Sequence, residues 1–258
     1  MRVISKTRFL EAVRNWNAKE VAAALHQRPE YVSLVDSAKR TPLHICAGRV
    51  ASGATNSSAA IATAKALVGA GATVNAVQPI PDDGEIFPAT ALWYALAWGR
   101  NRPLASYLLK RGADPNNCMF ALVYADDLTS AKLVRRHGAE IDEVFGGETP
   151  LIYAARHRRA TLVEWLLKEG ANPNFRDRRG LSALHHAVRR RLPDSTLRAL
   201  QKAGADAWTV SKDGVSVAQL ATRAQKGLLG LNDAANKRLQ PDRARERAGA
   251  QDDNRGIA

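Results

Sequence analysis

The sequence is poor in cysteine and in long apolar runs. Its 258 residues include only 2 cysteines, Cys46 and Cys118, too few for a disulfide framework or a four-cysteine zinc site. No stretch reaches the roughly 20 apolar residues that a transmembrane helix needs, and no apolar signal segment follows the polar first residues. We therefore expect a cytoplasmic protein, and the sequence leaves open its use as a secreted effector.

Acidic residues are also scarce. The chain has 25 Asp and Glu against 38 Lys and Arg, which gives a net charge of +13 and a pI of about 10.2. This excess favours acidic partners and says nothing about the fold. The hydrophobic share of 45% and the charged share of 24% are those of an ordinary folded protein. Residues 232–258 hold few large apolar side chains, so we expect a disordered tail there.

Two short motifs recur along the chain with a period of 33 to 34 residues in the clean copies. The first is Gly-Ala with an Asp, Asn or Glu two or four residues after the glycine, and it begins at Gly71, Gly112, Gly138, Gly170 and Gly204. The second is Thr or Ser before a Leu-containing apolar run, and it begins at Thr41, Thr90, Thr149, Ser182 and, degraded, Ser216. A repeat of this length predicts a solenoid of stacked units.

Each motif has a physical role in a helix–turn–helix unit. Thr149 is a suitable N-cap, and Pro150 occupies the first helical position, where its missing N–H costs nothing. A second apolar stripe over 162–167 has helical spacing and stops at Gly170, which suits a left-handed helix end. Polar turn-forming residues over 174–180 lead to the next cap. One unit is therefore helix, turn, helix, turn.

The motifs Thr41-Pro42-Leu43-His44 and Gly112-Ala113-Asp114-Pro115-Asn116 together resemble the ankyrin repeat family over about residues 8–222. The resemblance implies an all-α fold, an ankyrin-type solenoid of stacked helix–turn–helix repeats. It also implies projecting loops or β-hairpin fingers and a concave face. Members of the family bind other macromolecules and seldom catalyse reactions.

The departures from the repeat pattern suggest an organisation. We expect an N-terminal capping helix pair over 1–36, repeats over 37–215, a C-terminal capping helix over 216–231 and the tail. Within the repeats we expect an insertion at 49–58, a long finger at 76–88 and an irregular unit at 117–142. The insertion is small and polar, and we expect it to bury little.

The residues that could carry chemistry each have a structural explanation. His44 and His185 lie in the family's Thr-Pro-Leu-His slot, where the imidazole bonds to nearby backbone. Adjacent His185 and His186 should point in different directions on a helix. Cys46 and Cys118 are expected to be buried thiols, and no phosphate loop or nucleophile motif occurs. We expect no catalytic residue, no metal, no cofactor and no enzymatic activity.

The resemblance implies where partners bind, at the fingertips and at the open ends of the first helices. These positions form an aromatic set, consisting of Phe87, Trp98, Tyr124 and Phe145. They also form a basic set, consisting of Arg156, His157, Arg178, Arg179, Arg189, Arg190 and Lys212. Residues 149–200 carry 11 Arg and Lys against 4 acids, a net of +7. Solvated arginines and aromatic packing between repeats are the structural alternatives.

Arginine also stands where the family has a glycine that ends the first helix, at Arg158 and Arg191. A left-handed conformation there would cost about 1 to 2 kcal/mol for each arginine, which hints that the side chains are used. We expect a monomeric, bacterial protein that binds an acidic protein or peptide. The alternative is a binder of nucleic acid or an acidic lipid surface through a ladder of arginines.

Overall fold

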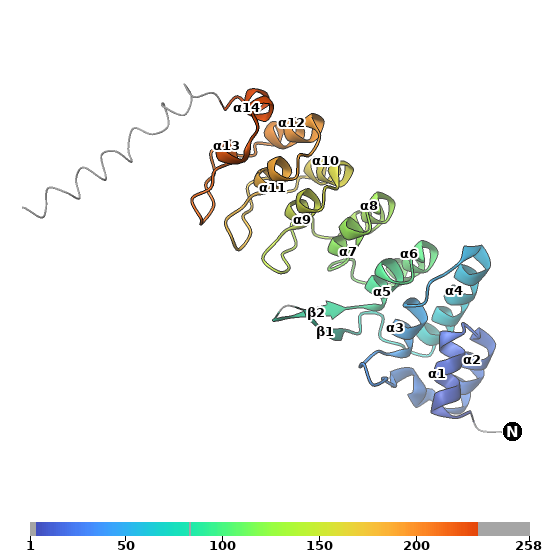
Figure 1. The fold of residues 1–258 in the computed structure, drawn as a ribbon. Coiled ribbons are helices and arrows are strands. Elements are labelled where there is room, and N and C mark those ends of the chain that lie inside the picture. Colours follow the sequence, from blue (N-terminus) through green and yellow to red (C-terminus); the bar gives the residue numbers. More distant parts are fainter. Residues whose placement is uncertain (1–3, 83, 232–258) are drawn as a thin grey trace, which may run out of the picture. The chain divides into compact units, whose positions relative to one another are not determined.

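Short helices in antiparallel pairs make up almost all of the regular structure (Figure 1). The computed structural model describes residues 4–82 and 84–231. Backbone contacts divide the chain into two compact units, the first ending at Tyr153 and the second beginning at Ala154. The expected tail, 232–258, lies outside the described residues.

The first unit contains helix pairs and a hairpin. Its elements are α1 Lys6–Arg14, α2 Ala18–Gln27, the 3-10 helix η1 Pro29–Ser33, α3 Pro42–Ala47, α4 Gly53–Gly69, β1 Gln78–Asp82, β2 Glu85–Ala89, α5 Ala91–Ala97, α6 Arg102–Lys110, α7 Met119–Tyr124 and α8 Leu128–Arg136. First helices α1, α3, α5 and α7 pack in series, and so do second helices α2, α4, α6 and α8. This stacking of equivalent helices is the expected solenoid arrangement.

Helix α9, Pro150–Arg156, begins in the first unit and ends in the second. The second unit continues with α10 Ala160–Lys168, α11 Ala183–Arg189, α12 Asp194–Lys202, α13 Val217–Leu220 and α14 Arg223–Leu228. Here α10 packs on α12, α12 on α14 and α11 on α13. The closing helix expected over 216–231 is therefore two short helices, because Ala221 is extended and Thr222 caps a new helix.

The recurring Thr or Ser is the N-cap of a first helix. The Thr41 hydroxyl accepts a hydrogen bond from the His44 amide, and Thr90 caps α5 through the Trp93 amide. The leucine that follows each cap is buried, as Leu43, Leu92, Leu151 and Leu184 show with exposures of 0 to 1%. The repeat motif thus fixes both the start of a helix and the side chain that fills the space between helix pairs.

Most first helices are followed by a left-handed residue that is not glycine, and α3, which ends at Gly48 with a φ of −81°, is an exception. Arg158 has a φ of 61° and Arg191 a φ of 53°, as the missing glycines predicted. Equivalent residues after α1, α5 and α7 are left-handed too, namely Trp16, Arg100 and Asp126. The conformation is therefore a property of this chain's repeats, and it is no special sign that the two arginines are used.

The expected insertion at 49–58 forms the loop after α3 and the first turns of α4. Seven of its ten residues are exposed, so it buries little side-chain surface, yet it is tied to the next repeat. The Ala51 amide donates to the Gly99 carbonyl at 3.1 Å, and Ser57 is buried. Gly99 has no room for a side chain, because a Cβ there would lie 2.3 Å from the Ala47 carbonyl oxygen. The segment therefore connects two repeats.

The long finger is an antiparallel hairpin. Gln78 pairs with Ala89 and Asp82 with Glu85, so the tip lies beyond Asp82. The Gln78 side chain is buried and donates to the Ala38 carbonyl at 2.8 Å. The base of the hairpin is thereby tied to the turn that precedes α3.

Candidate functional site

The aromatic residues of the first unit form a cluster at the hairpin base and on the first helices. Phe87 lies 5.1 Å from the Trp93 ring and 5.2 Å from the Phe145 ring, measured between centroids. Its side chain is only 7% exposed, so Phe87 is a core residue and our choice of it as a contact at the fingertip is wrong. Neighbouring Ile86, 62% exposed, faces outward because successive strand residues point to opposite faces.

Two other aromatic candidates are exposed. Trp98 is 60% exposed at the end of α5, and Tyr124 is 63% exposed at the end of α7. Phe145 is half-buried between Phe87 and Phe120. Trp93, which our sequence rule did not select, packs between Phe87 and Trp98. Its ring centroid lies 6.4 Å from that of Trp98. The cluster therefore has a packed base and one exposed ring, Trp98, while Tyr124 is exposed at the end of another first helix.

In the second unit, arginines from the ends of consecutive first helices lie close together. Arg189 and Arg190 are exposed at the end of α11, while Arg156 and His157 are half-buried at the end of α9. Burial lowers the pKa of His157, and the positive charges of Arg156, Arg159 and Arg190 lower it further. Charged side chains of two adjacent repeats therefore act on the same imidazole.

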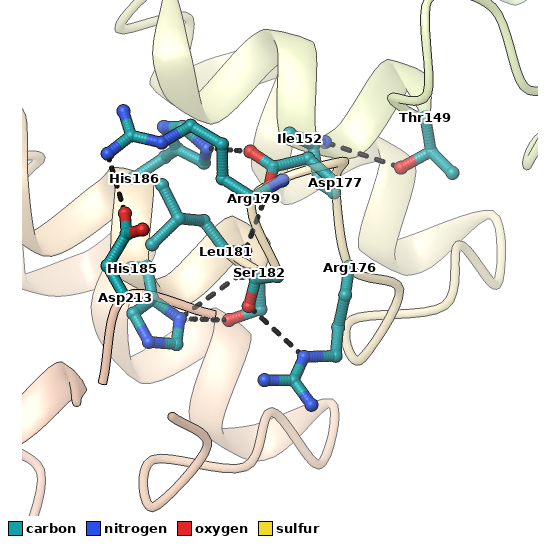
Figure 2. Close-up of polar contacts among 11 residues, drawn as sticks. Thr149, Ile152, Arg176, Asp177, Arg179, Leu181, Ser182, His185, His186 and Asp213 are labelled. Atoms are coloured by element: carbon teal, nitrogen blue, oxygen red, sulfur yellow. Dashed lines mark hydrogen bonds and ion pairs between the residues drawn. The ribbon is translucent and has the colours of Figure 1, made fainter. Parts of the chain in front are cut away.

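The basic fingertips of the second unit are partly neutralised. The Lys212 amide donates to the Arg179 carbonyl at 2.9 Å, so the two loops lie side by side. The exposed Arg179 guanidinium pairs with the Asp213 carboxylate at 3.0 Å (Figure 2). Arg178 and Lys212 are exposed. The acid beside Arg179 makes the helix ends the more strongly positive part of this unit.

The histidines hold neighbouring repeats together. His185 Nδ1 accepts a hydrogen bond from the Ser182 amide at 3.2 Å, which leaves Nε2 to donate to the Val215 carbonyl at 3.3 Å. His186 points elsewhere and bonds to the Asp177 carboxylate at 2.9 Å (Figure 2). As predicted, the two rings face different partners, and neither offers a free base for chemistry.

His44 repeats this arrangement in the first unit. Its Nδ1 accepts from the Thr41 amide at 3.2 Å, and Nε2 donates to the Ala89 carbonyl at the same distance. Burial lowers the pKa of both His44 and His185, so each ring is neutral in the folded protein.

Both thiols are buried, in agreement with the sequence prediction. Burial raises the pKa of Cys46 to about 12, and burial also raises the pKa of Cys118. A thiol with so high a pKa is a poor nucleophile at neutral pH, because the thiolate is the reactive form. No helix in the described part of the chain is long and apolar enough to span a membrane.

Comparisons with known proteins agree with this architecture. Residues 136–187 match the family model for ankyrin repeats in many copies. A 93-residue stretch, 35% of the chain, is 32% identical to the chicken (Gallus gallus) Arf-GAP with coiled-coil, ANK repeat and PH domain-containing protein 2. The chain matches only 12% of the length of that relative.

Two solved structures share the fold over 86% of this chain and 96% of their own. The human ASB11 ankyrin repeat domain is 22% identical, with a TM-score of 0.63. The ankyrin repeat domain of Bcl-3, described as a unique member of the IkappaB protein family, is 24% identical, with a TM-score of 0.66. At this level of identity the likeness concerns the fold.

Proposed function

We propose that this chain, which is built of ankyrin repeats, is a non-catalytic module that binds an acidic protein or peptide. The partner would lie along the concave side, where the first helices end. In the first unit the exposed rings of Trp98 and Tyr124 are the anchors, and in the second unit the arginines of α9 and α11 are. Exposed aromatic residues and arginines are the usual anchors of protein interfaces.

One observation carries this proposal. The pKa of His157 is lowered by burial and by three arginines, of which Arg190 belongs to the next repeat. Like charges that lie this close together repel each other, and an acidic partner would relieve that repulsion.

The test is charge reversal at residues that make no ion pair within the described part of the chain. We expect the triple variant Arg189→Glu, Arg190→Glu and Lys212→Glu to weaken partner binding at least about tenfold, because each reversal turns attraction into repulsion. Arg179 is left in place, since a glutamate there would face Asp213. The partner is captured from the source cell, and its affinities for the wild type and for the variant are then measured.

The matched control reverses Lys19, Lys65 and Lys110, three exposed residues of the first unit that make no ion pair among the described residues. It changes the net charge by the same amount. An equal loss of affinity in both variants would therefore mean that net charge, and not the position of the charges, explains the effect. Unchanged binding by the first variant would contradict the basic contact surface. Circular dichroism and melting must show that both variants remain folded.

The second candidate is binding to nucleic acid or to an acidic lipid surface through the same arginines. Phosphate contacts release counterions, so affinity for a polyanion falls steeply as salt is raised. An interface anchored by Trp98 and Tyr124 loses less affinity under the same change. A salt titration with a DNA duplex as the probe therefore separates the two functions.

A further inference from the structure

We propose that the first unit carries a second anion-binding site, separate from the arginines of the second unit, which holds an acidic side chain of a protein partner. The site is a hollow of about 340 Å³ whose lining includes Arg14, Arg40, Arg49, Tyr94 and Trp98. None of the residues that our sequence rules selected lines it, apart from Trp98. The inference rests on the proposed function only in taking the ligand to be a segment of protein.

The hollow has a basic wall. Arg14 comes from the last turn of α1, Arg40 from the turn before α3 and Arg49 from the loop after α3. No acidic residue of the described chain lines the hollow. Arg40 is partly neutralised by Asp36, with nitrogen and oxygen 2.7 Å apart. Arg14 and Arg49 make no ion pair among the described residues, and they provide the positive charge for an incoming anion.

Arg49 is held in position before any ligand arrives. Its Nη1 donates to the Arg14 carbonyl at 2.8 Å and to the Asn15 side-chain oxygen at 3.3 Å. Its guanidinium also lies 4.8 Å from the centre of the Trp16 ring, a cation–π contact. These contacts use one nitrogen of the planar fork, and Nε and Nη2 make no hydrogen bond within the described chain. An arginine fixed in this way binds a carboxylate without further loss of side-chain freedom.

Two aromatic residues also line the hollow. The Tyr94 ring packs against Gly48, where a Cβ would lie 2.9 Å from a ring carbon, so glycine is needed at the end of α3. Trp98 lies 6.5 Å from Tyr94 between ring centroids and remains 60% exposed. Arginines and an exposed indole in one hollow suit an acidic side chain whose neighbour in the peptide is apolar.

The size of the hollow limits the ligand. About 340 Å³ is near the lower end of the range of about 300 to 1,000 Å³ for small-ligand pockets, so it has room for side chains but none for a folded segment. Two available arginines match one carboxylate with a bidentate contact. We therefore assign the site to an Asp or Glu side chain that an extended peptide inserts.

The test uses a fluorescein-labelled peptide of alternating Glu and Leu, and its Gln and Leu counterpart as the uncharged probe. Binding is measured by anisotropy in the background of the Arg189→Glu, Arg190→Glu, Lys212→Glu variant, which removes the basic surface of the second unit. We expect the Glu peptide to bind in this background and the Gln peptide to bind much less. Arg14→Gln and Trp98→Ala should each weaken binding about tenfold.

Arg14 and Trp98 are exposed, so these substitutions leave the core intact. Arg28→Gln, which removes the same charge from an exposed residue outside the hollow, should leave binding unchanged. Equal binding by the Arg14 and Arg28 variants would overturn the site. If inorganic phosphate binds more tightly than the Glu peptide and displaces that peptide, the assignment of the site to a carboxylate is overturned.

The same experiment separates this site from the proposed function. If the background variant loses all peptide binding, the arginines of the second unit bind the acid and the hollow does not. If the background variant binds as well as the wild type and Arg14→Gln abolishes that binding, the hollow binds the acidic peptide and the basic surface of the second unit does not.

Discussion

Single residues show where sequence reasoning succeeds and where it stops. Arg158 and Arg191 could be predicted to be left-handed because the repeat motif fixes the position at which the first helix ends. Phe87 was misplaced because the same rule selects two adjacent strand residues, and only one of them can face outward. The rule contains no information on which of the two packs against Trp93.

The left-handed arginines yield a prediction about stability. We expect Arg191→Gly to be more stable than Arg190→Gly by about 1 kcal/mol, because glycine relieves strain only where φ is positive. Arg191 has a φ of 53°, whereas Arg190 has a φ of −85°. Both side chains are exposed and adjacent, so the pair controls for lost charge. Urea unfolding measures the difference, and equal stabilities would contradict the strain.

At the scale of elements, the contacts of the loops between repeats are the feature that is hardest to predict from the sequence. The segment 49–58 looks like a dispensable insertion, because its residues are small and polar. In the structure its Ala51 amide meets the Gly99 carbonyl of the next repeat, a contact between positions far apart in the chain. No local pattern in the sequence predicts such a pairing, since it depends on how the repeats stack.

The loop between α8 and α9 contains a carboxyl group in an unfavourable position. Burial raises the pKa of Glu143 to about 7, although one oxygen accepts from the Asn117 amide at 2.7 Å. The other oxygen is buried and has no hydrogen-bond partner among the described residues. The folded protein therefore binds a proton more tightly than the unfolded chain does. This contribution to stability is complete below pH 4.5 and is lost as the pH rises to about 7.

Accordingly, Glu143→Gln should stabilise the protein more at pH 8 than at pH 4.5, because glutamine keeps an acceptor for Asn117 without the buried charge. Melting temperatures at the two pH values measure this difference. The control is Glu11→Gln on an exposed position of α1. A gain that is independent of pH would contradict the raised pKa.

For the whole molecule, the period of the motifs was enough to predict the fold, because the buried leucines and the caps recur in phase. The division after Tyr153 was not predictable, since motifs continue across it without a change in composition. The hollow was equally hidden. Its arginines come from separate segments, and only the stacked structure brings them together, although Arg49 follows Thr41 by the same eight residues that separate Trp98 from Thr90.

The buried histidines affect the stability of the whole molecule. Burial lowers the pKa of His44 and His185, so these side chains bind protons more tightly in the unfolded chain than in the folded protein. Their contribution to stability is complete above pH 6.5 and declines as the pH falls below it. We expect His44→Asn to be less stable than wild type at pH 8 and the gap to narrow towards pH 5. Melting curves test this, and a constant gap would contradict the neutral ring.

The imidazole contacts also constrain how such a chain can lengthen or shorten through recombination. The acceptor of His44 is Ala89, the residue just before the cap Thr90, and the acceptor of His185 is Val215, the residue just before Ser216. A duplication or loss of one whole period presents the same carbonyl to the same ring. A crossover that adds or removes only part of a repeat leaves a buried Nε2–H without its acceptor, which costs about 1 to 3 kcal/mol. The hydrogen bond thus favours genetic change in whole repeats.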